Sequence, residues 1–95
     1  MKVGVPKEIK THEYRVGLTP ESVREYTARG HEVLVESQAG AGIGAGDDAY
    51  RNAGATILAD ARAVFDAAEL IVKVKEPQPA EMAMLRPRHV LFTYL

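Results

Sequence analysis

The sequence predicts an α/β domain built on a mainly parallel sheet of about five strands. Short apolar runs of strand length recur along the 95 residues, and segments that begin with helix-start residues separate them. Strands that alternate with helices in this way pair in parallel, through right-handed crossovers. A chain of this length forms one domain at most, with enough apolar residues for one real core.

The first predicted strand is Lys2–Val5, which Pro6 ends, and a loop crowded with charged residues follows it as far as Leu18. Thr19-Pro20-Glu21 then predicts the start of a helix. It offers an N-cap hydroxyl, a proline at the first helical position and an acid in the first turn. Gly30 is the expected end of this helix, because glycine readily adopts the left-handed backbone that closes a helix.

The second predicted strand is Glu32–Glu36, and the glycine-rich stretch Gly40–Gly46 after it is expected to be a flexible connection. Asp47 is expected to cap a short helix that Gly54 closes. Read loosely, the glycine-rich stretch contains a G-x-G-x-x-A dinucleotide motif. Asp47-Asp48 would repel a pyrophosphate at the start of that helix, so no cofactor-binding residues are expected in this chain.

The third predicted strand is Ala55–Leu58, and Asp60 is expected to cap the helix after it. The apolar residues of that helix fall at i, i+3, i+4 and i+7: Ala61, Val64, Phe65 and Ala68. Glu69–Val74 is the fourth strand, Ala80–Leu85 a short helical turn, and His89–Leu95 the fifth strand. Together these elements predict a flavodoxin-like, three-layer unit. The last strand is apolar and has no polar tail, so the chain is expected to be a truncated product.

The composition narrows the function classes. A net charge of -1 gives no electrostatic reason to expect a nucleic acid or an anionic membrane as partner. The chain has no cysteine, and its three histidines (His12, His31 and His89) are scattered, so no metal site is expected. The sequence has no apolar run of the about 18 residues that span a bilayer and no signal-peptide core. A cytoplasmic location is therefore expected.

Lys73-Val-Lys75-Glu-Pro77 places cations at the end of an apolar strand, where a buried ammonium group needs an anion. Arg15 lies in the loop after the first strand, and the carboxyl ends of parallel strands share one edge of the sheet. Arg15 and Lys75 can therefore reach one crevice, where they would suit a small α-keto or α-amino acid. On the residues alone, two solvated surface charges are the simpler interpretation.

Four segments together resemble the N-terminal region of alanine dehydrogenases: Val5-Pro-Lys-Glu8, Tyr14-Arg-Val-Gly-Leu-Thr-Pro20, Gly30-His-Glu-Val33 and Lys73-Val-Lys-Glu-Pro77. The resemblance runs from Met1 to Leu95, with the segments in the right order and at the right spacing. The N-terminal domain of the proton-translocating transhydrogenase α subunit is similar around Arg15 and Thr19-Pro20. The lysine-bearing form of the last segment favours alanine dehydrogenase.

The resemblance implies an oxidoreductase that converts L-alanine, NAD and water into pyruvate, ammonia and NADH. Arg15 matches the arginine that holds the substrate carboxylate. Lys75 matches the catalytic and substrate-binding lysine that hydrogen-bonds the carbonyl oxygen of pyruvate. Residues 1–95 would form the N-terminal part of the substrate-binding domain. The catalytic histidine and the NAD-binding domain of the family lie downstream, so we expect this chain to be inactive alone. The resemblance also implies that the full-length enzyme is a homo-oligomer, a hexamer.

Two alternatives remain open at this point. The first is that the chain is the N-terminal segment of a proton-translocating transhydrogenase α subunit, which it also resembles. A stand-alone, non-catalytic module that binds a small carboxylate is the other.

Overall fold

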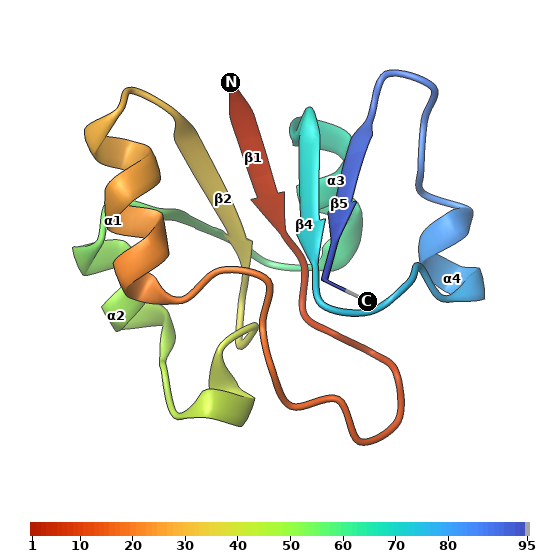
Figure 1. The fold of residues 1–95 in the computed structure, drawn as a ribbon, viewed down its shortest axis with the longest axis horizontal. Coiled ribbons are helices and arrows are strands. Elements are labelled where there is room, and N and C mark those ends of the chain that lie inside the picture. Colours follow the sequence, from red (N-terminus) through yellow and green to blue (C-terminus); the bar gives the residue numbers. More distant parts are fainter. Residues whose placement is uncertain (95) are drawn as a thin grey trace.

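The computed structural model describes residues 1–94, which form a five-stranded parallel sheet in the order β3-β2-β1-β4-β5 (Figure 1). The strands are β1 (Lys2–Val5), β2 (Glu32–Glu36), β3 (Thr56–Leu58), β4 (Leu70–Lys73) and β5 (Val90–Thr93). The predicted α/β class is confirmed. Within it, the order 3-2-1-4-5 is that of dinucleotide-binding doubly wound sheets, whereas flavodoxin itself has 2-1-3-4-5.

Helices cover both faces of the sheet, as predicted. The described helices are α1 (Pro20–Ala28), the 3₁₀ helix η1 (Ala41–Ile43), α2 (Asp47–Asn52), α3 (Ala61–Ala67) and α4 (Pro79–Met82). Helices α1 and α2 pack together beside β2 and β3, and α3 lies behind the sheet in Figure 1, against β1 and β2. The chain therefore changes face after β3, and β4 returns to the other side of β1.

The core lies on both faces of the central strand. Val3 and Val5 pack with Tyr50 on the side of α1 and α2. Gly4 faces α3 so closely that an added methyl group would lie 2.6 Å from the Cβ of Ala68. A parallel strand covered on both faces needs apolar or small residues throughout, which explains why β1 shows no polar alternation.

Two helix starts and two helix ends agree with the sequence, and one of these ends is Gly54, which follows α2 with a φ of 104°. The Thr19 hydroxyl accepts the backbone N–H of Ser22, and Asp60 accepts that of Ala63 at 2.9 Å. Gly30 has a φ of 86° just after α1. These signals are local in the chain, which is why they could be found without the fold.

The predicted cap at Asp47 is wrong. Gly46 is the N-cap of α2, and Asp47 is the first residue of the helix. Its carboxylate accepts the Ser37 hydroxyl at 2.7 Å and the backbone N–H of Gln38 at 2.8 Å. These two bonds lower the pKa of Asp47, the Gln38 bond first. Asp47 therefore ties the start of α2 back to the end of β2.

The last strand does not lie in a core. Strand β5 is shorter than the predicted range, and Leu95 lies outside the described residues. Val90, Leu91 and Phe92 are 59%, 38% and 52% exposed. The apolar run therefore forms an exposed edge of the sheet.

Within residues 1–94, no helix has the length and apolar character that crossing a membrane requires.

Candidate functional site

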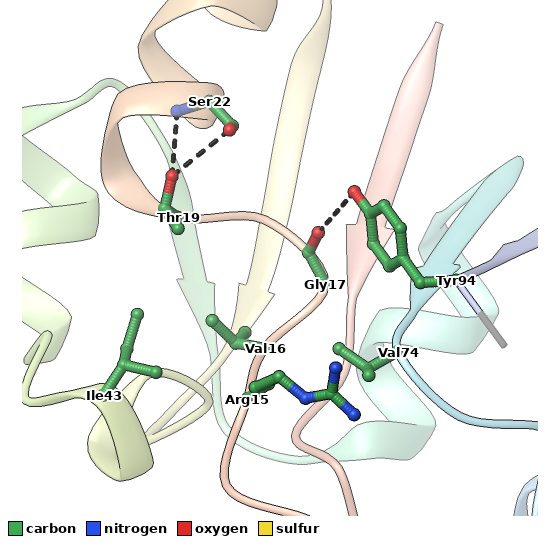
Figure 2. A pocket seen from close by; sticks show the side chains of 8 residues that line it. All are labelled: Arg15, Val16, Gly17, Thr19, Ser22, Ile43, Val74 and Tyr94. Atoms are coloured by element: carbon green, nitrogen blue, oxygen red, sulfur yellow. Dashed lines mark hydrogen bonds between the residues drawn. The ribbon is translucent and has the colours of Figure 1, made fainter.

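The loop after β1 returns across the end of β4 and forms one wall of a pocket. Gly17 makes this approach possible, because a side chain there would overlap the backbone carbonyl of Val72. The pocket has a volume of about 360 Å³ and is lined by Arg15, Val16, Gly17, Thr19, Ser22, Ile43, Val74 and Tyr94 (Figure 2). It lies at the carboxyl ends of β1 and β4, where open α/β sheets bind ligands.

Arg15 is the cation of this pocket. Figure 2 shows its guanidinium beside Val74, which also lines the pocket. The side chain is 64% exposed, yet its orientation is fixed by Glu13. Nε donates to Oε2 of Glu13 and Nη2 donates to Oε1, each at 2.9 Å. The backbone N–H of Arg15 donates to the same Oε2 at 3.0 Å.

The Glu13 carboxyl group stays ionised to unusually low pH because of its contacts with Arg15. The hydrogen bonds from the side chain and then the backbone of Arg15 lower its pKa from 4.5 to about 2, and the charge of Lys75 adds to this lowering. In return, the hydrogen bond with Glu13 raises the pKa of Arg15, with a further contribution from the charge of Glu8. Sequence reasoning overlooked Glu13, although its spacing of two from Arg15 was a visible signal.

Lys75, the other predicted site residue, lies just beyond the end of β4 and is half-buried. Its backbone N–H donates to Oε1 of Glu8 at 3.3 Å. Arg15 and Val74 line the pocket, but Lys75 is not among the lining residues. The structure therefore does not place Arg15 and Lys75 on one pocket wall, although the charge of Lys75 contributes to the lowered pKa of Glu13, the partner of Arg15.

Lys73 is a buried ammonium group of the kind for which the strand pattern predicted an anion. Its ammonium group lies 3.0 Å from Oε1 of Glu8 and 2.9 Å from Oε2 of Glu81, and all three side chains are 1% exposed. Glu8 also accepts the backbone N–H of Val74 at 3.1 Å. The anion that this buried lysine needs is therefore internal to the fold. We call Glu8, Lys73 and Glu81 the buried triad.

Helix α4 supplies the third member of the buried triad. Glu81 closes a capping box, because its Oε1 accepts the backbone N–H of Gln78 at 2.9 Å. Its other oxygen faces Lys73. One glutamate thus starts a helix and pairs with the buried lysine, which fixes the segment that follows Lys75.

The outer part of the loop after β1 is held by exposed contacts. Lys10 and Glu76 form an ion pair at 2.6 Å, and the hydrogen bond from Lys10 lowers the pKa of Glu76. His12 has a φ of 63° and its Nδ1 lies 3.1 Å from the hydroxyl of Tyr14. His12 is exposed and does not line the pocket.

The glycine-rich stretch after β2 is a packed turn in this structure. A side chain at Gly42 would overlap the backbone carbonyl of Tyr14, which is the residue before Arg15. The space beside Gly42 is therefore filled by protein, whereas nothing lies within 4 Å of a methyl group added at Gly44 or Gly46. Among the described residues, no three histidine or acidic side chains gather as metal ligands would.

Tyr94 is a pocket residue that sequence reasoning did not single out. Its hydroxyl donates to the backbone carbonyl of Gly17 at 3.0 Å (Figure 2). The ring thus connects the residue after β5 with the loop after β1, which are 77 positions apart. Its position in the pocket depends on strand order, which the sequence did not specify.

The chain matches one protein family and is similar to curated members of it. Residues 4–95 match the family described as "Alanine dehydrogenase/PNT, N-terminal domain". Over 95 residues the chain is 55% identical to an alanine dehydrogenase of Halomonas elongata and 54% identical to one of Bacillus subtilis. The whole chain aligns, and it spans 26% and 25% of these two relatives, about a quarter of their length.

Two solved structures have the same fold. An L-alanine dehydrogenase superposes with a TM-score of 0.95 at 48% identity, over 98% of this chain and 26% of that one. A transhydrogenase from Sinorhizobium meliloti superposes with a TM-score of 0.91 at 32% identity, over 100% of this chain and 28% of that one. Both of the families that the sequence resembles are thus represented among the structural relatives.

Proposed function

Because this chain belongs to the alanine dehydrogenase/PNT N-terminal domain family, we propose that it supplies the substrate-carboxylate site of an NAD-dependent alanine dehydrogenase. The reaction would interconvert L-alanine, NAD and water with pyruvate, ammonia and NADH. Residues 1–95 would act as the N-terminal part of the substrate-binding domain.

One observation carries this proposal: the guanidinium of Arg15 is fixed at the mouth of a pocket that is large enough for a three-carbon acid. Arginine binds carboxylates through two parallel N–H groups, which fixes the orientation of the acid as well as its position. Orientation of the substrate toward a hydride donor is a large part of catalysis in such reactions.

Lys75 is proposed to act on the other end of the substrate. An ammonium group that hydrogen-bonds a carbonyl oxygen stabilises the negative charge that develops there when the carbonyl carbon is reduced. The half-buried position of Lys75, with its backbone held by Glu8, suits this role. In the present structure Lys75 lies outside the pocket lining, so the substrate would have to extend from Arg15 past Val74 to reach it.

The two aspartates that open α2 disfavour a dinucleotide pyrophosphate at that helix start. We therefore expect NAD to be bound by residues outside this chain. Assembly as a homo-oligomer and a cytoplasmic location stay predictions, as does the expectation that no nucleic acid or membrane binds.

The proposal can be tested in a chimera in which this chain replaces the matching 95 residues of the Halomonas elongata alanine dehydrogenase. Arg15→Ala and Lys75→Ala should each lower kcat/KM for pyruvate by roughly a hundredfold or more, because each removes a charge-assisted contact to the substrate. Arg51→Ala is the matched control, since Arg51 is also an exposed arginine paired with an acid, Asp48, at 2.8 Å. Near-unchanged kcat/KM in Arg15→Ala would refute the carboxylate site, and near-unchanged kcat/KM in Lys75→Ala would refute the role proposed for Lys75.

The second candidate function is that of a transhydrogenase α subunit, because a transhydrogenase is among the structural relatives. A chain of that type would support no alanine turnover, so the unsubstituted chimera should lack alanine-dependent reduction of NAD if this chain belongs to it. A stand-alone carboxylate-binding module makes a different prediction. The 95-residue chain would be monodisperse and its NMR signals near Arg15 would shift on addition of pyruvate.

A further inference from the structure

We propose that Glu13 is the positioning residue of the carboxylate site: it holds one edge of the Arg15 guanidinium so that the other edge is presented to the substrate. This inference rests on the proposed function, because it assigns Glu13 a task that matters only if Arg15 binds a carboxylate. It adds a residue that neither the sequence motifs nor the pocket lining had indicated.

The hydrogen-bond pattern defines which edge is occupied. Glu13 accepts from Nε and Nη2, which together form one side of the planar guanidinium. The second edge, formed by Nη1–H and the remaining Nη2–H, keeps two parallel donors that match a carboxylate. The described hydrogen bonds include none from Nη1 of Arg15. The pair therefore leaves a complete second fork for a ligand.

Glu13 is anchored in a way that an ordinary surface partner is not. Its Oε2 also accepts the backbone N–H of Arg15, so the carboxylate stays attached to residue 15 even when the arginine side chain moves. The Glu13 side chain is only 5% exposed, whereas that of Arg15 is 64% exposed. The carboxylate thus lies beneath the guanidinium and not between it and solvent. In this arrangement Glu13 supports the guanidinium from below and leaves its outer side accessible to a ligand.

The loop that carries both residues is itself held firmly. Gly42 packs against the backbone of Tyr14, which lies between Glu13 and Arg15, and Gly17 packs against the backbone of Val72. A support that fixes a side chain is useful only where the backbone beneath it is fixed, and these two contacts provide that.

The same pair admits an opposite role, in which Glu13 occupies the arginine until a substrate displaces it. The two roles differ in the sign of one measurement. If Glu13 positions Arg15, its removal weakens substrate binding and raises KM. If Glu13 blocks Arg15, its removal lowers KM.

The experiment uses the chimera described above and measures KM and kcat for pyruvate in Glu13→Gln and Glu13→Ala. We expect KM to rise about tenfold or more in Glu13→Ala, with kcat changed much less, because the contact acts on binding of the carboxylate. Glu13→Gln should lie between the wild type and Glu13→Ala, since its amide oxygen can still accept one of the bonds. Asp48→Ala, which removes the partner of Arg51, is the matched control and should leave both constants unchanged.

A second readout is the Nε–H signal of Arg15 in the NMR spectrum of the 95-residue chain. It should exchange slowly with solvent in the wild type and rapidly in Glu13→Ala, while the backbone spectrum away from the loop is unchanged. A lowered KM, or an unchanged KM beside a large loss in Arg15→Ala, would overturn the inference and leave the proposed function standing. A silent Arg15→Ala would instead refute the proposed function itself.

Discussion

The carboxylate of Glu8 and the ammonium group of Lys73 meet 3.0 Å apart, although 65 positions separate them in the chain. Glu8 follows β1 and Lys73 ends β4, so this contact joins the ends of two neighbouring strands. Glu8 also accepts the backbone N–H groups of Val74 and Lys75. The contact therefore sets where the chain goes after β4, and with it the place of Lys75.

Removal of the buried ammonium group should destabilise the fold strongly. In Lys73→Met, Glu8 and Glu81 would face each other in the core without a cation. Loss of one member of a buried ionic group costs about 3–5 kcal/mol. Urea unfolding of the 95-residue chain measures it. The control is Lys10→Met, which breaks an exposed pair with Glu76 worth at most about 1 kcal/mol. Equal losses in the two variants would contradict the role given to the buried triad.

The carboxyl group of Glu13 should titrate far below an ordinary glutamate, with a pKa of about 2 that rises toward 4.5 in Arg15→Gln. Because the folded-state pKa is lowered, the ionised group contributes stability above pH 4.5, and this contribution is lost as pH falls toward about 2. Carbon-13 NMR of the side-chain carboxyl group, followed against pH, checks both statements. An ordinary pKa in the wild type would show that the Arg15 contact is not formed in solution.

Tyr50 should make the protein sensitive to high pH. Its hydroxyl donates to the Leu18 carbonyl at 2.8 Å, and burial, aided by the charge of Glu21, raises its pKa to about 12. A raised pKa favours the neutral form in the fold, so stability is lost as pH rises from 10 toward about 12. Tyr50→Phe should cost about 1–2 kcal/mol near neutral pH, because it leaves the Leu18 carbonyl without its donor. Tyr50→Phe should also remove the loss of stability at alkaline pH. Urea unfolding at a series of pH values measures this. If the variant still lost stability between pH 10 and about 12, Tyr50 would not be the source of the loss.

A methyl group at Gly17 should move the loop that carries Arg15. It would overlap the backbone carbonyl of Val72, and neither backbone can yield without displacing a neighbour. We expect Gly17→Ala to cost roughly 1–3 kcal/mol and to raise KM for pyruvate in the chimera. Gly46→Ala is the control for the added methyl group, since nothing lies within 4 Å of it and φ is −80°. Because Gly46 is the N-cap of α2, we expect this control to lose about 1 kcal/mol at most. If the two variants unfolded at the same urea concentration, the close approach at Gly17 would not be structurally important.

The sequence predicted those features that short-range chemistry determines. Thr19, Asp60 and Gly30 mark helix ends because their effect depends on the next few residues. Asp47 carried the same local signal, but its carboxylate found better donors at Ser37 and Gln38 in the preceding segment. A cap and a link between segments look alike in sequence, and only the path of the chain separates them.

The candidate site was predictable in its parts and not in its arrangement. Arg15 was placed correctly at the sheet edge from the strand pattern. The partners of Lys73 were not found, because Glu8 and Glu81 approach it from separate elements and no periodicity connects them. Glu13 was missed for another reason. A charged loop offers many possible pairs, and the fold selects one of them by burying its carboxylate.

The outer edge of strand β5 favours self-association of residues 1–95. Its outer edge faces no further strand among residues 1–94, and it carries Val90, Leu91 and Phe92 in exposed positions. An apolar edge of this kind is a template to which the same strand of another molecule can add. Concentrated samples should therefore form oligomers through edge-to-edge pairing, and a lysine introduced at Phe92 should keep them dispersed in light-scattering measurements.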